Sequence, residues 1–443
     1  MEMTKMENNQ DLVTPKTKIP FFKRITKLGP RLSHSFQNTR KLILLFQIMS
    51  LFLVFVSNEE GILARDFLFL AGFVLVSTLT NLFIGKVTKG DVYILQIATF
   101  LFSVGVAMIY RLDSALGIRQ ILWYLMGLVV FYAVYFIMKA FKGWKNLTWL
   151  YLIGCFALFA VTLLFGTRTG GAINWIHIGG FNFQPSEVTK LLFIFLLPSF
   201  YLNKNFLKGF KYRPYFMMAT VYIFIAFFFI QRDLGTAVIF YGLFLLSQFV
   251  YGEDRHLILL NIILAVAGFV LAYFLFNHIR VRILTWVNPW EHIDGMGYQI
   301  TQALFAIASG GFFGTGIGLG DPKLIPVVES DFIFAAIAEE MGIFTGMGVI
   351  MLFLILVYRG FKIALEQKNL YFKFIAMGVS MLFAIQSIIM FGGVLKLFPL
   401  TGVTIPFVSY GGSSIISSFM SLGVLQFCSS DIRSKGEVED GEY

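Results

Sequence analysis

Long apolar runs recur along the chain from Lys41 almost to its C-terminal end, and short polar stretches separate them. A helix needs roughly 20 apolar residues to cross the hydrocarbon core of a bilayer, because each residue advances it by only about 1.5 Å. The pattern therefore predicts an all-α polytopic membrane protein with about 12 transmembrane helices. The predicted spans cover residues 41–57, 65–85, 92–111, 118–140, 147–166, 188–203, 214–230, 235–251, 256–276, 331–358, 372–395 and 404–428.

The composition agrees with this class of protein. Hydrophobic residues make up 57% of the chain and charged residues 14%, whereas a soluble domain carries about 25% charged residues. The net charge of +10 would suggest a nucleic-acid partner in a soluble protein. Here the basic residues cluster in the short polar stretches, as membrane topology requires, so no nucleic acid is expected. Cys155 and Cys428 lie in or beside apolar runs without metal-ligand spacing, which indicates packing residues.

Basic residues also predict the orientation. Residues 1–40 are polar and basic, and we expect them to form a disordered cytoplasmic tail, because Lys and Arg are retained on the cytoplasmic side. With alternating spans, the loops that fall inside carry Lys86, Lys89, Lys139, Lys142, Lys145, Lys204, Lys208, Lys211, Arg213, Arg359, Lys362 and Lys368. An even number of spans then places both termini in the cytoplasm, with a cytoplasmic tail at residues 429–443.

Two long connections fall on the outer side, residues 167–187 and the large loop 277–330 before the last three helices. Long connections in a compact bundle usually carry function. Ionisable side chains in or beside apolar runs are costly, so they need a partner, a wet cavity or a function. On this topology the outer half of the bundle gathers Glu187, Lys190, Asp233, Asp331, Glu339 and Glu340.

Four segments combine Gly, Pro, aromatic and polar residues in an ordered series. They are Gly171-Ala-Ile-Asn-Trp-Ile176 with Phe183-Gln-Pro-Ser-Glu-Val-Thr-Lys190; Gln231-Arg-Asp-Leu-Gly-Thr236; Asn288-Pro-Trp290 through Gly297-Tyr-Gln299 to Ser330-Asp-Phe-Ile-Phe-Ala335 and Glu339-Glu-Met-Gly342; and Pro399-Leu-Thr-Gly402 with Pro406-Phe-Val-Ser-Tyr-Gly-Gly-Ser-Ser414. Together these motifs resemble the SEDS family, the RodA, FtsW and SpoVE proteins of bacterial wall elongation, division and sporulation.

The resemblance covers residues 92–428 and implies a ten-helix core in the bacterial cytoplasmic membrane. It implies a glycosyltransferase that polymerises lipid II into glycan strands at the outer face of that membrane. The two spans within residues 41–91 would be an N-terminal addition to this core. The resemblance also implies a class B penicillin-binding protein, a transpeptidase, as partner.

Glycan transfer from a lipid-linked pyrophosphate needs a carboxylate that accepts the proton of the attacking hydroxyl. Cations or a metal ion stabilise the departing pyrophosphate. Lys190, Arg280 and Arg282 are candidate cations, and Asn174 replaces an Arg that the resemblance leads us to expect. The departure of pyrophosphate benefits from a divalent cation, but the sequence contains no metal-ligand signature. A divalent cation such as Mg²⁺ or Mn²⁺ therefore stays open as a cofactor.

The resemblance implies a catalytic Asp in the large loop, within the pattern Asn-Pro-Trp-x-Asp followed by Gly-Tyr-Gln. Asn288-Pro-Trp290 and Gly297-Tyr-Gln299 keep the usual spacing, which puts His292 in the Asp position and Asp294 two residues later. We predict that Asp294 is the catalytic base. His292 is the alternative, because histidine titrates near neutral pH. A third reading is a copy that is inactive or uses another carboxylate.

The candidate substrate-binding residues are Trp175, Glu187, Lys190, Asp233, Arg280, Arg282, Asp331, Glu339 and Ser409. Several also have a structural interpretation. Asp233 and Asp331 each stand at a helix start, where an Asp can cap the helix. Glu187 and Lys190 are three residues apart on a helix and can form an ion pair.

Two further expectations concern local backbone geometry. Glu339 and Glu340 are neighbours on a predicted helix, so we expect them on different faces, with at most one lining a cavity. Ser409-Tyr-Gly-Gly412 predicts a re-entrant or broken helix start, which needs cover from protein or water.

Two other functions fit part of the pattern. Twelve spans with intramembrane charges also suit a lipid II flippase or a secondary transporter, but such carriers show internal repeats and charges near the midplane. The charges here gather toward the outer edge, and no repeat is evident. The departure at His292 is compatible with a non-catalytic scaffold for a wall synthase.

Overall fold

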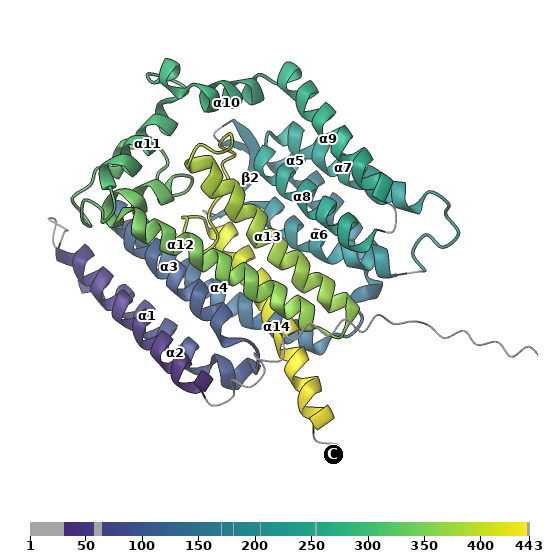
Figure 1. The fold of residues 1–443 in the computed structure, drawn as a ribbon, viewed down its shortest axis with the longest axis horizontal. Coiled ribbons are helices and arrows are strands. Elements are labelled where there is room, and N and C mark those ends of the chain that lie inside the picture. The colour runs from purple at the N-terminus through teal and green to yellow at the C-terminus, as the bar shows by residue number, and fades with distance from the viewer. Residues whose placement is uncertain are drawn as a thin grey trace, which may run out of the picture.

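The computed structural model describes residues 31–56, 64–169, 171–179, 181–203, 205–252 and 255–440. In these residues, eleven helices are long and apolar enough to cross a membrane, and a shorter apolar stretch, Tyr215–Gln231, lies in a further helix. The long helices run roughly antiparallel in one bundle (Figure 1). They are α1 (Arg31–Val56), α2 (Ala64–Thr88), α3 (Val92–Leu112), α4 (Ser114–Ala140), α5 (Thr148–Phe165), α6 (Pro185–Leu202), α7 (Arg213–Gln231), α8 (Leu234–Tyr251), α9 (Arg255–Leu275), α12 (Ile333–Glu366), α13 (Leu370–Val394) and α14 (Gly412–Asp440). The predicted polytopic all-α architecture is confirmed.

Successive helices alternate in direction, so the long connections all lie at one end of the bundle, which we term the long-loop end. It carries residues 166–184, 276–332 and 395–411. The opposite end carries the short connections between α2 and α3, α4 and α5, and α12 and α13. The predicted tail residues 1–30 and 441–443, Lys204 and the acidic pair at 253–254 lie outside the described residues.

The large connection between α9 and α12 is itself partly helical. It contains α10 (Asn277–Val287), η3 (Pro289–His292), α11 (Tyr298–Gly310) and η4 (Pro322–Leu324). Figure 1 shows α10 and α11 arching along the upper left of the bundle, with α11 beside α12. The predicted large loop is therefore a structured cover over one end.

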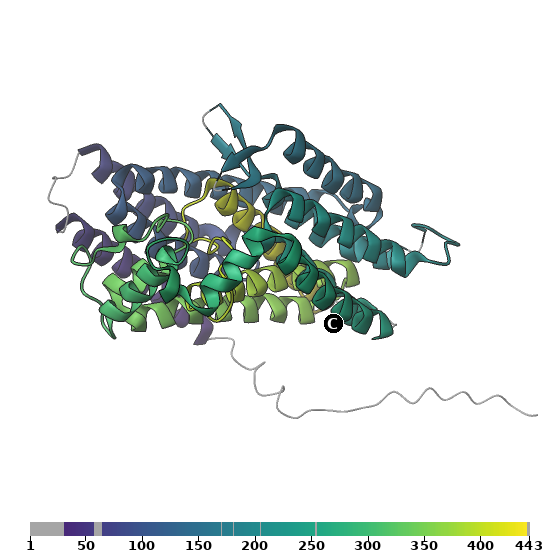
Figure 2. The same cartoon turned by 90° about the horizontal axis from the view of Figure 1, so that it is seen from above.

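The sequence predicted no strands, yet the first long connection forms a small antiparallel sheet. The strands are β1 (Thr167–Thr169), β2 (Ala172–Ile178) and β3 (Phe181–Phe183), in the order β1-β2-β3. Ile176 pairs with Phe183, which brings the two halves of the first motif together. Gly171 and Gly179 have positive φ and form the turns. Figure 2 shows this sheet projecting from the bundle.

The segment before α14 differs from the predicted span. That span was expected to begin at residue 404, but α14 begins at Gly412 and the chain from Pro399 to Gly411 is non-helical. Pro399 and Pro406 lack the N–H that a helix interior requires, and Phe407 has a φ of 66°. The side chains of Ile405, Phe407 and Val408 are buried, so this segment packs inside the bundle. This arrangement agrees with the predicted broken helix start and its protein cover.

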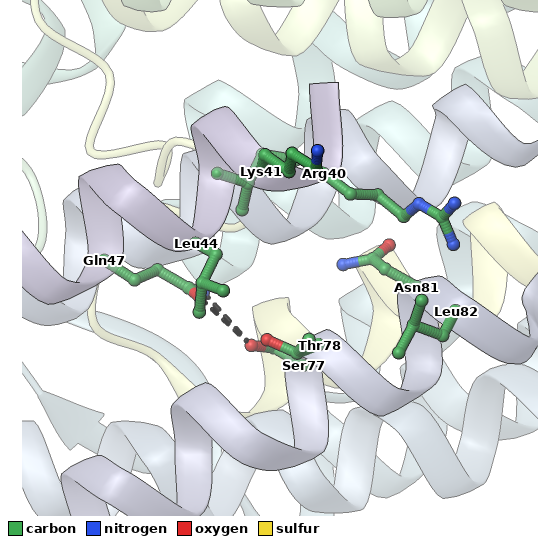
Figure 3. A pocket seen from close by; sticks show the side chains of 9 residues that line it. Arg40, Lys41, Leu44, Gln47, Ser77, Thr78, Asn81 and Leu82 are labelled. Carbon is green, nitrogen blue, oxygen red and sulfur yellow. Dashed lines mark hydrogen bonds between the residues drawn. The ribbon is translucent and has the colours of Figure 1, made fainter. Parts of the chain in front are cut away.

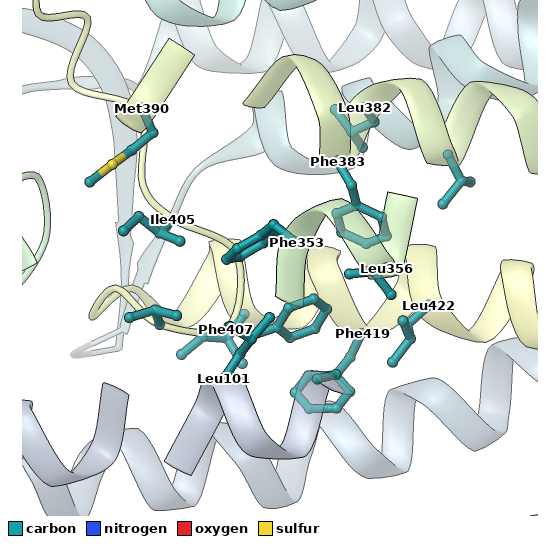
Figure 4. Packing of buried hydrophobic residues seen from close by; sticks show 14 of the residues in the cluster. Leu101, Phe353, Leu356, Leu382, Phe383, Met390, Ile405, Phe407, Phe419 and Leu422 are labelled. Atoms are coloured by element: carbon teal, nitrogen blue, oxygen red, sulfur yellow. The ribbon is translucent and has the colours of Figure 1, made fainter. Parts of the chain in front are cut away.

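Packing around this segment holds it in place. An added Cβ at Gly105 of α3 would lie 2.4 Å from the Val408 oxygen, so only glycine permits the approach. Phe407 packs edge-on against Phe419 of α14 at 5.5 Å between ring centroids. Figure 4 shows these rings among buried side chains of α3, α12 and α13. The core thus fixes the loop that borders the candidate site.

The predicted N-terminal addition packs against α3 through buried polar contacts. Gln47 of α1 donates to the Ser103 hydroxyl at 2.8 Å, and Asn81 of α2 donates to the Thr99 hydroxyl at 3.3 Å. The Tyr110 hydroxyl donates to Asp66 at 3.1 Å. Hydrogen bonds between helices are favoured in an apolar surrounding, where the polar groups have few other partners.

Candidate active site

Five polar side chains from separate parts of the sequence meet at the long-loop end. We term this set the long-loop cluster. It consists of Asn174 on β2, Gln184 before α6, Asp233 between α7 and α8, Arg282 on α10 and Asp331 before α12. The sequence predicted three of the five, Asp233, Arg282 and Asp331, as candidate substrate-binding residues.

Asp233 has both of the roles between which the sequence could not decide. Its Oδ1 accepts a hydrogen bond of 3.1 Å from the Thr236 N–H and so caps α8. Its Oδ2 accepts from the amides of Asn174 at 3.3 Å and Gln184 at 3.4 Å. The preceding residue, Arg232, ends α7 in the left-handed conformation and turns the chain so that Asp233 lies in the cluster.

Arg282 is the cation of the cluster. Its Nη1 donates a hydrogen bond of 3.1 Å to the main-chain oxygen of Thr401. Burial lowers the pKa of Arg282, and the carboxylates of Asp233 and Asp331 oppose that shift. A guanidinium keeps its charge in proteins, so Arg282 is a fixed positive charge near two acidic residues.

Asp331 is the second carboxylate near Arg282. The predicted capping role is not seen, because the N-cap of α12 is Phe332 and no side chain caps that helix. Instead Oδ1 of Asp331 accepts a hydrogen bond of 3.2 Å from the Ser330 hydroxyl. Burial raises the pKa of Asp331, and the Ser330 hydroxyl and the Arg282 charge partly offset this effect.

Ser409 holds the backbone next to Asp331. Its buried hydroxyl donates to the Ser330 oxygen at 2.6 Å and accepts from the Ile405 N–H at 2.9 Å. The Tyr410 N–H also donates to the Glu329 oxygen at 2.8 Å. These bonds join the segment before α14 to the start of α12, so Ser409 lies behind the cluster as a structural support. Its predicted contact with substrate stays a prediction.

His278 was not singled out from the sequence, but it borders the cluster. Burial lowers the pKa of His278, and the positive charges of Arg282 and Arg232 act in the same direction. Its Nε2 is buried without a hydrogen-bond partner in the described residues. One turn separates it from Arg282 on α10, and this spacing is the only signal that the sequence offered.

Glu187 and Lys190 form the ion pair that their spacing allowed. Nζ of Lys190 lies 2.9 Å from Oε1 of Glu187, and both side chains are buried. The Ser417 hydroxyl donates to the other carboxylate oxygen of Glu187. The two charges therefore compensate each other between α6 and α14. The predicted role of the pair in substrate binding stays a prediction.

Glu339 and Glu340 were expected on different faces of α12, with at most one lining a cavity, and this stays a prediction. Glu339 accepts from the Asp321 N–H at 2.9 Å, and Glu340 accepts from the Gly318 N–H at 3.1 Å, so both hold the same glycine-rich loop. Gly342, whose φ of 83° interrupts α12 just after the two residues, also leaves their main-chain oxygens to accept from the Thr315 and Gly316 N–H groups of that loop. Arg111 lies 3.3 Å from Glu340 and neutralises part of the charge.

Among the described residues, the remaining predicted residues make no hydrogen bond or ion pair with side chains of the long-loop cluster. Asp294 is exposed in the turn after η3, and His292 beside it is half-buried. Trp175 is half-buried on β2, where its oxygen accepts from the Thr167 hydroxyl at 3.1 Å. Arg280 is exposed, and its guanidinium bonds to the Phe274 oxygen at 3.3 Å. Their catalytic and binding roles stay predictions.

The cluster does not fit a resident metal ion. In the described residues, no three His, Cys, Asp or Glu side chains gather as metal ligands. Asp233 already accepts three hydrogen bonds, and the positive charge of Arg282 lies near both carboxylates. The positive charge available at this site is therefore that of Arg282.

Comparison with known proteins places this chain in a family. Residues 91–433 match the model of the family described as "Cell cycle protein", which groups FtsW, RodA and SpoVE. The peptidoglycan glycosyltransferase RodA of Mycobacterium bovis is 33% identical over 360 residues, with 76% of this chain and 77% of that protein covered. Stage V sporulation protein E of Bacillus subtilis is 35% identical over 360 residues, with 77% and 97% covered.

Solved structures show the same fold. A chain from a peptidoglycan synthase complex that coordinates polymerization and crosslinking aligns with a TM-score of 0.67 and 23% identity, covering 77% of this chain and 98% of that one. The rod shape determining protein RodA of Thermus thermophilus aligns with a TM-score of 0.57 and 23% identity, covering 77% and 97%. The family match begins at residue 91, so α1 and α2 precede it. This chain is a multi-pass membrane protein that belongs to the FtsW/RodA/SpoVE family.

Proposed function

We propose that this chain is a peptidoglycan glycosyltransferase that polymerises lipid II, an undecaprenyl-pyrophosphate-linked disaccharide-peptide. The single observation that carries the proposal is the place of Arg282 at the long-loop end, where its guanidinium bonds to the Thr401 oxygen near the carboxylates of Asp233 and Asp331. Transfer of a sugar from a lipid pyrophosphate generates negative charge on the leaving group. A fixed guanidinium in a partly buried site is suited to stabilise that charge.

The reaction needs little other chemistry. A hydroxyl of one lipid-linked sugar attacks the anomeric carbon of another, and a new C–O bond forms. The bond between that carbon and the pyrophosphate oxygen breaks, and the lipid pyrophosphate leaves with the electron pair. The hydroxyl proton passes to a carboxylate.

Asp294 is our proposed base. It is exposed in the turn between η3 and α11, on the same large connection as Arg282. An exposed carboxylate on a loop can approach a bound sugar without the loss of existing hydrogen bonds. His292 stays the alternative acceptor, two residues earlier.

Substrate and orientation follow from the arrangement of charge. The long-loop cluster lies at one end of the bundle, where the sequence places the outer face of the cytoplasmic membrane, with both termini in the cytoplasm. A lipid carrier can reach this end from the bilayer between apolar helices. Lipid II and a class B penicillin-binding protein transpeptidase are the proposed substrate and partner, in cell shape, division or sporulation.

The rival functions predict other arrangements. A flippase or transporter needs a polar path or broken helices near the midplane. The interrupted backbone in the described residues, at Gly342 and before α14, lies toward the long-loop end instead. A non-catalytic scaffold would have no need for Arg282 beside two carboxylates.

The experiment is lipid II polymerisation by the purified full chain, with and without its cognate transpeptidase. Asp294→Ala and His292→Ala are compared with wild type, and thermal unfolding verifies that each variant is folded. Glycan ladders from wild type and His292→Ala, but not from Asp294→Ala, are the expected result. Loss in His292→Ala alone would move the base to His292. A folded wild-type complex that makes no glycan would refute the proposed function, and lipid II translocation in proteoliposomes would then support the flippase.

A further inference from the structure

A crevice opens between α1 and α2, outside the part of the chain that matches the family. Its volume is about 310 Å³, and the side chains that line it include Arg40, Lys41, Leu44, Gln47, Asn81 and Leu82. Figure 3 shows Arg40 and Lys41 at one edge and the Gln47–Ser77 hydrogen bond at the other. The crevice combines a basic mouth, a polar floor and apolar walls.

The floor contains an acceptor without a donor. Asn81 is only 3% exposed, and its Nδ2 donates to the Thr99 hydroxyl at 3.3 Å. That hydroxyl donates to the Leu95 oxygen at 2.8 Å, so it can only accept from Asn81. The amide orientation is thereby fixed, and Oδ1 of Asn81 has no partner in the described residues. A buried acceptor without a donor is costly, and a ligand that donates a hydrogen bond removes the cost.

Two basic side chains give the mouth a positive charge. Arg40 and Lys41 are successive residues near the start of the predicted span of α1, where their charges lie close to the membrane surface. Basic residues at this depth attract anionic lipid headgroups. Beyond the mouth, exposed apolar side chains such as Leu45 on α1 and Leu79 on α2 offer a path for acyl chains.

We propose that this crevice binds an anionic glycerophospholipid whose headgroup carries a hydroxyl, of the phosphatidylglycerol class. The phosphodiester binds Arg40 and Lys41, a headgroup hydroxyl donates to Oδ1 of Asn81, and the acyl chains follow the outer faces of α1 and α2. The volume lies at the lower end of small-molecule sites, about 300–1,000 Å³, which suits a headgroup rather than a whole lipid. The site is independent of glycan synthesis and gives the two additional helices a binding function.

The test uses the full chain in phosphatidylcholine nanodiscs with a photoactivatable phosphatidylglycerol, whose diazirine lies near the headgroup end of an acyl chain. Adducts are mapped by mass spectrometry, and unlabelled lipids compete. We expect adducts on the peptides that contain residues 40–47 and 77–82. The double variant Arg40→Gln/Lys41→Gln should lower this labelling about tenfold, whereas Lys139→Gln/Lys142→Gln, a matched pair of exposed lysines at the C-terminal end of α4, should not change it.

A lipid comparison tests Asn81 without a mutation that would disturb its bond to Thr99. Phosphatidylethanol has the same charge as phosphatidylglycerol but lacks the headgroup hydroxyls. It should compete about fivefold less well, because one hydrogen bond is lost. Equal labelling of Arg40→Gln/Lys41→Gln and Lys139→Gln/Lys142→Gln would overturn the proposal. Phosphatidylcholine that competes as well as phosphatidylglycerol would also overturn it, because the bound lipid would then be nonspecific.

Discussion

Arg282 on α10 donates a hydrogen bond of 3.1 Å to the main-chain oxygen of Thr401, 119 residues later in the chain. This bond joins the large connection after α9 to the segment before α14. An added Cβ at Gly402, the next residue, would lie 3.5 Å from Oδ2 of Asp331. The cation and the carboxylate of the candidate site are thus set against the same short stretch of backbone.

Asp331 should make the protein less stable at neutral pH than it would be with a neutral side chain. Burial raises the pKa of this carboxyl from its usual 3.8, so the ionised form is disfavoured in the folded protein. A raised pKa gives stability that is complete below the unfolded pKa and is lost as pH rises through the folded one. Asp331→Asn should therefore raise Tm by roughly 1–3 °C at pH 7.5.

The pH dependence of this variant provides its control. The difference in Tm between Asp331→Asn and wild type should shrink as pH falls toward 4, because the wild-type carboxyl then becomes neutral too. Thermal unfolding in detergent at several pH values measures this. A lower Tm for the variant at pH 7.5 would mean that attraction to Arg282 outweighs the cost of burial.

Glu187 and Lys190 should depend on each other for stability. Both are buried, so removal of one partner leaves the other charge uncompensated, at a cost of about 3–5 kcal/mol in free energy of unfolding. Lys190→Met and Glu187→Gln should each lower Tm clearly. The double variant should recover most of the loss, because it removes both charges. Losses that simply add in the double variant would show that the pair makes no coupled contribution.

Gly342 should not tolerate a side chain. Its φ is 83°, and an added Cβ would lie 2.4 Å from the Phe312 oxygen. Gly342→Ala should cost at least about 1–2 kcal/mol in free energy of unfolding, since the left-handed backbone alone costs that much. Gly348 is the matched control on the same helix, because an added Cβ there meets nothing within 4 Å. Gly348→Ala should be neutral or stabilising by up to about 1 kcal/mol, and equal effects at both positions would contradict the proposed close approach.

The sequence predicted the helices well because their signal is local. Apolar length marks each span, and most ends agree within a few residues; α1 instead begins at Arg31, ten residues before its predicted span. The sheet at residues 167–183 was missed because its three short strands depend on pairing with one another. The predicted start of the last span at residue 404 was wrong, because two prolines and a left-handed Phe407 delay the start of α14 until Gly412.

The candidate site was predicted only in part, because its signals are partly local and partly depend on contacts between distant segments. Asp233, Arg282 and Asp331 stand out because charges near apolar runs are costly. Which charges share a site depends on contacts between distant segments, so the sequence could not separate Arg282, inside the cluster, from Arg280, which is exposed. It also could not show that Glu339 and Glu340 hold one loop, because the loop residues that they bond lie 18 and 22 residues earlier in the chain.

The most direct test of the proposed function is the rate of lipid II polymerisation by Arg282→Gln, measured with the cognate transpeptidase present. The account predicts a loss of about 100-fold or more in a variant that thermal unfolding shows to be folded, because the variant removes the charge that stabilises the leaving pyrophosphate. Lys323→Gln, an exposed charge on η4 of the same connection, should polymerise at the wild-type rate. Wild-type polymerisation by a folded Arg282→Gln variant would contradict the assignment of the active site to this cluster.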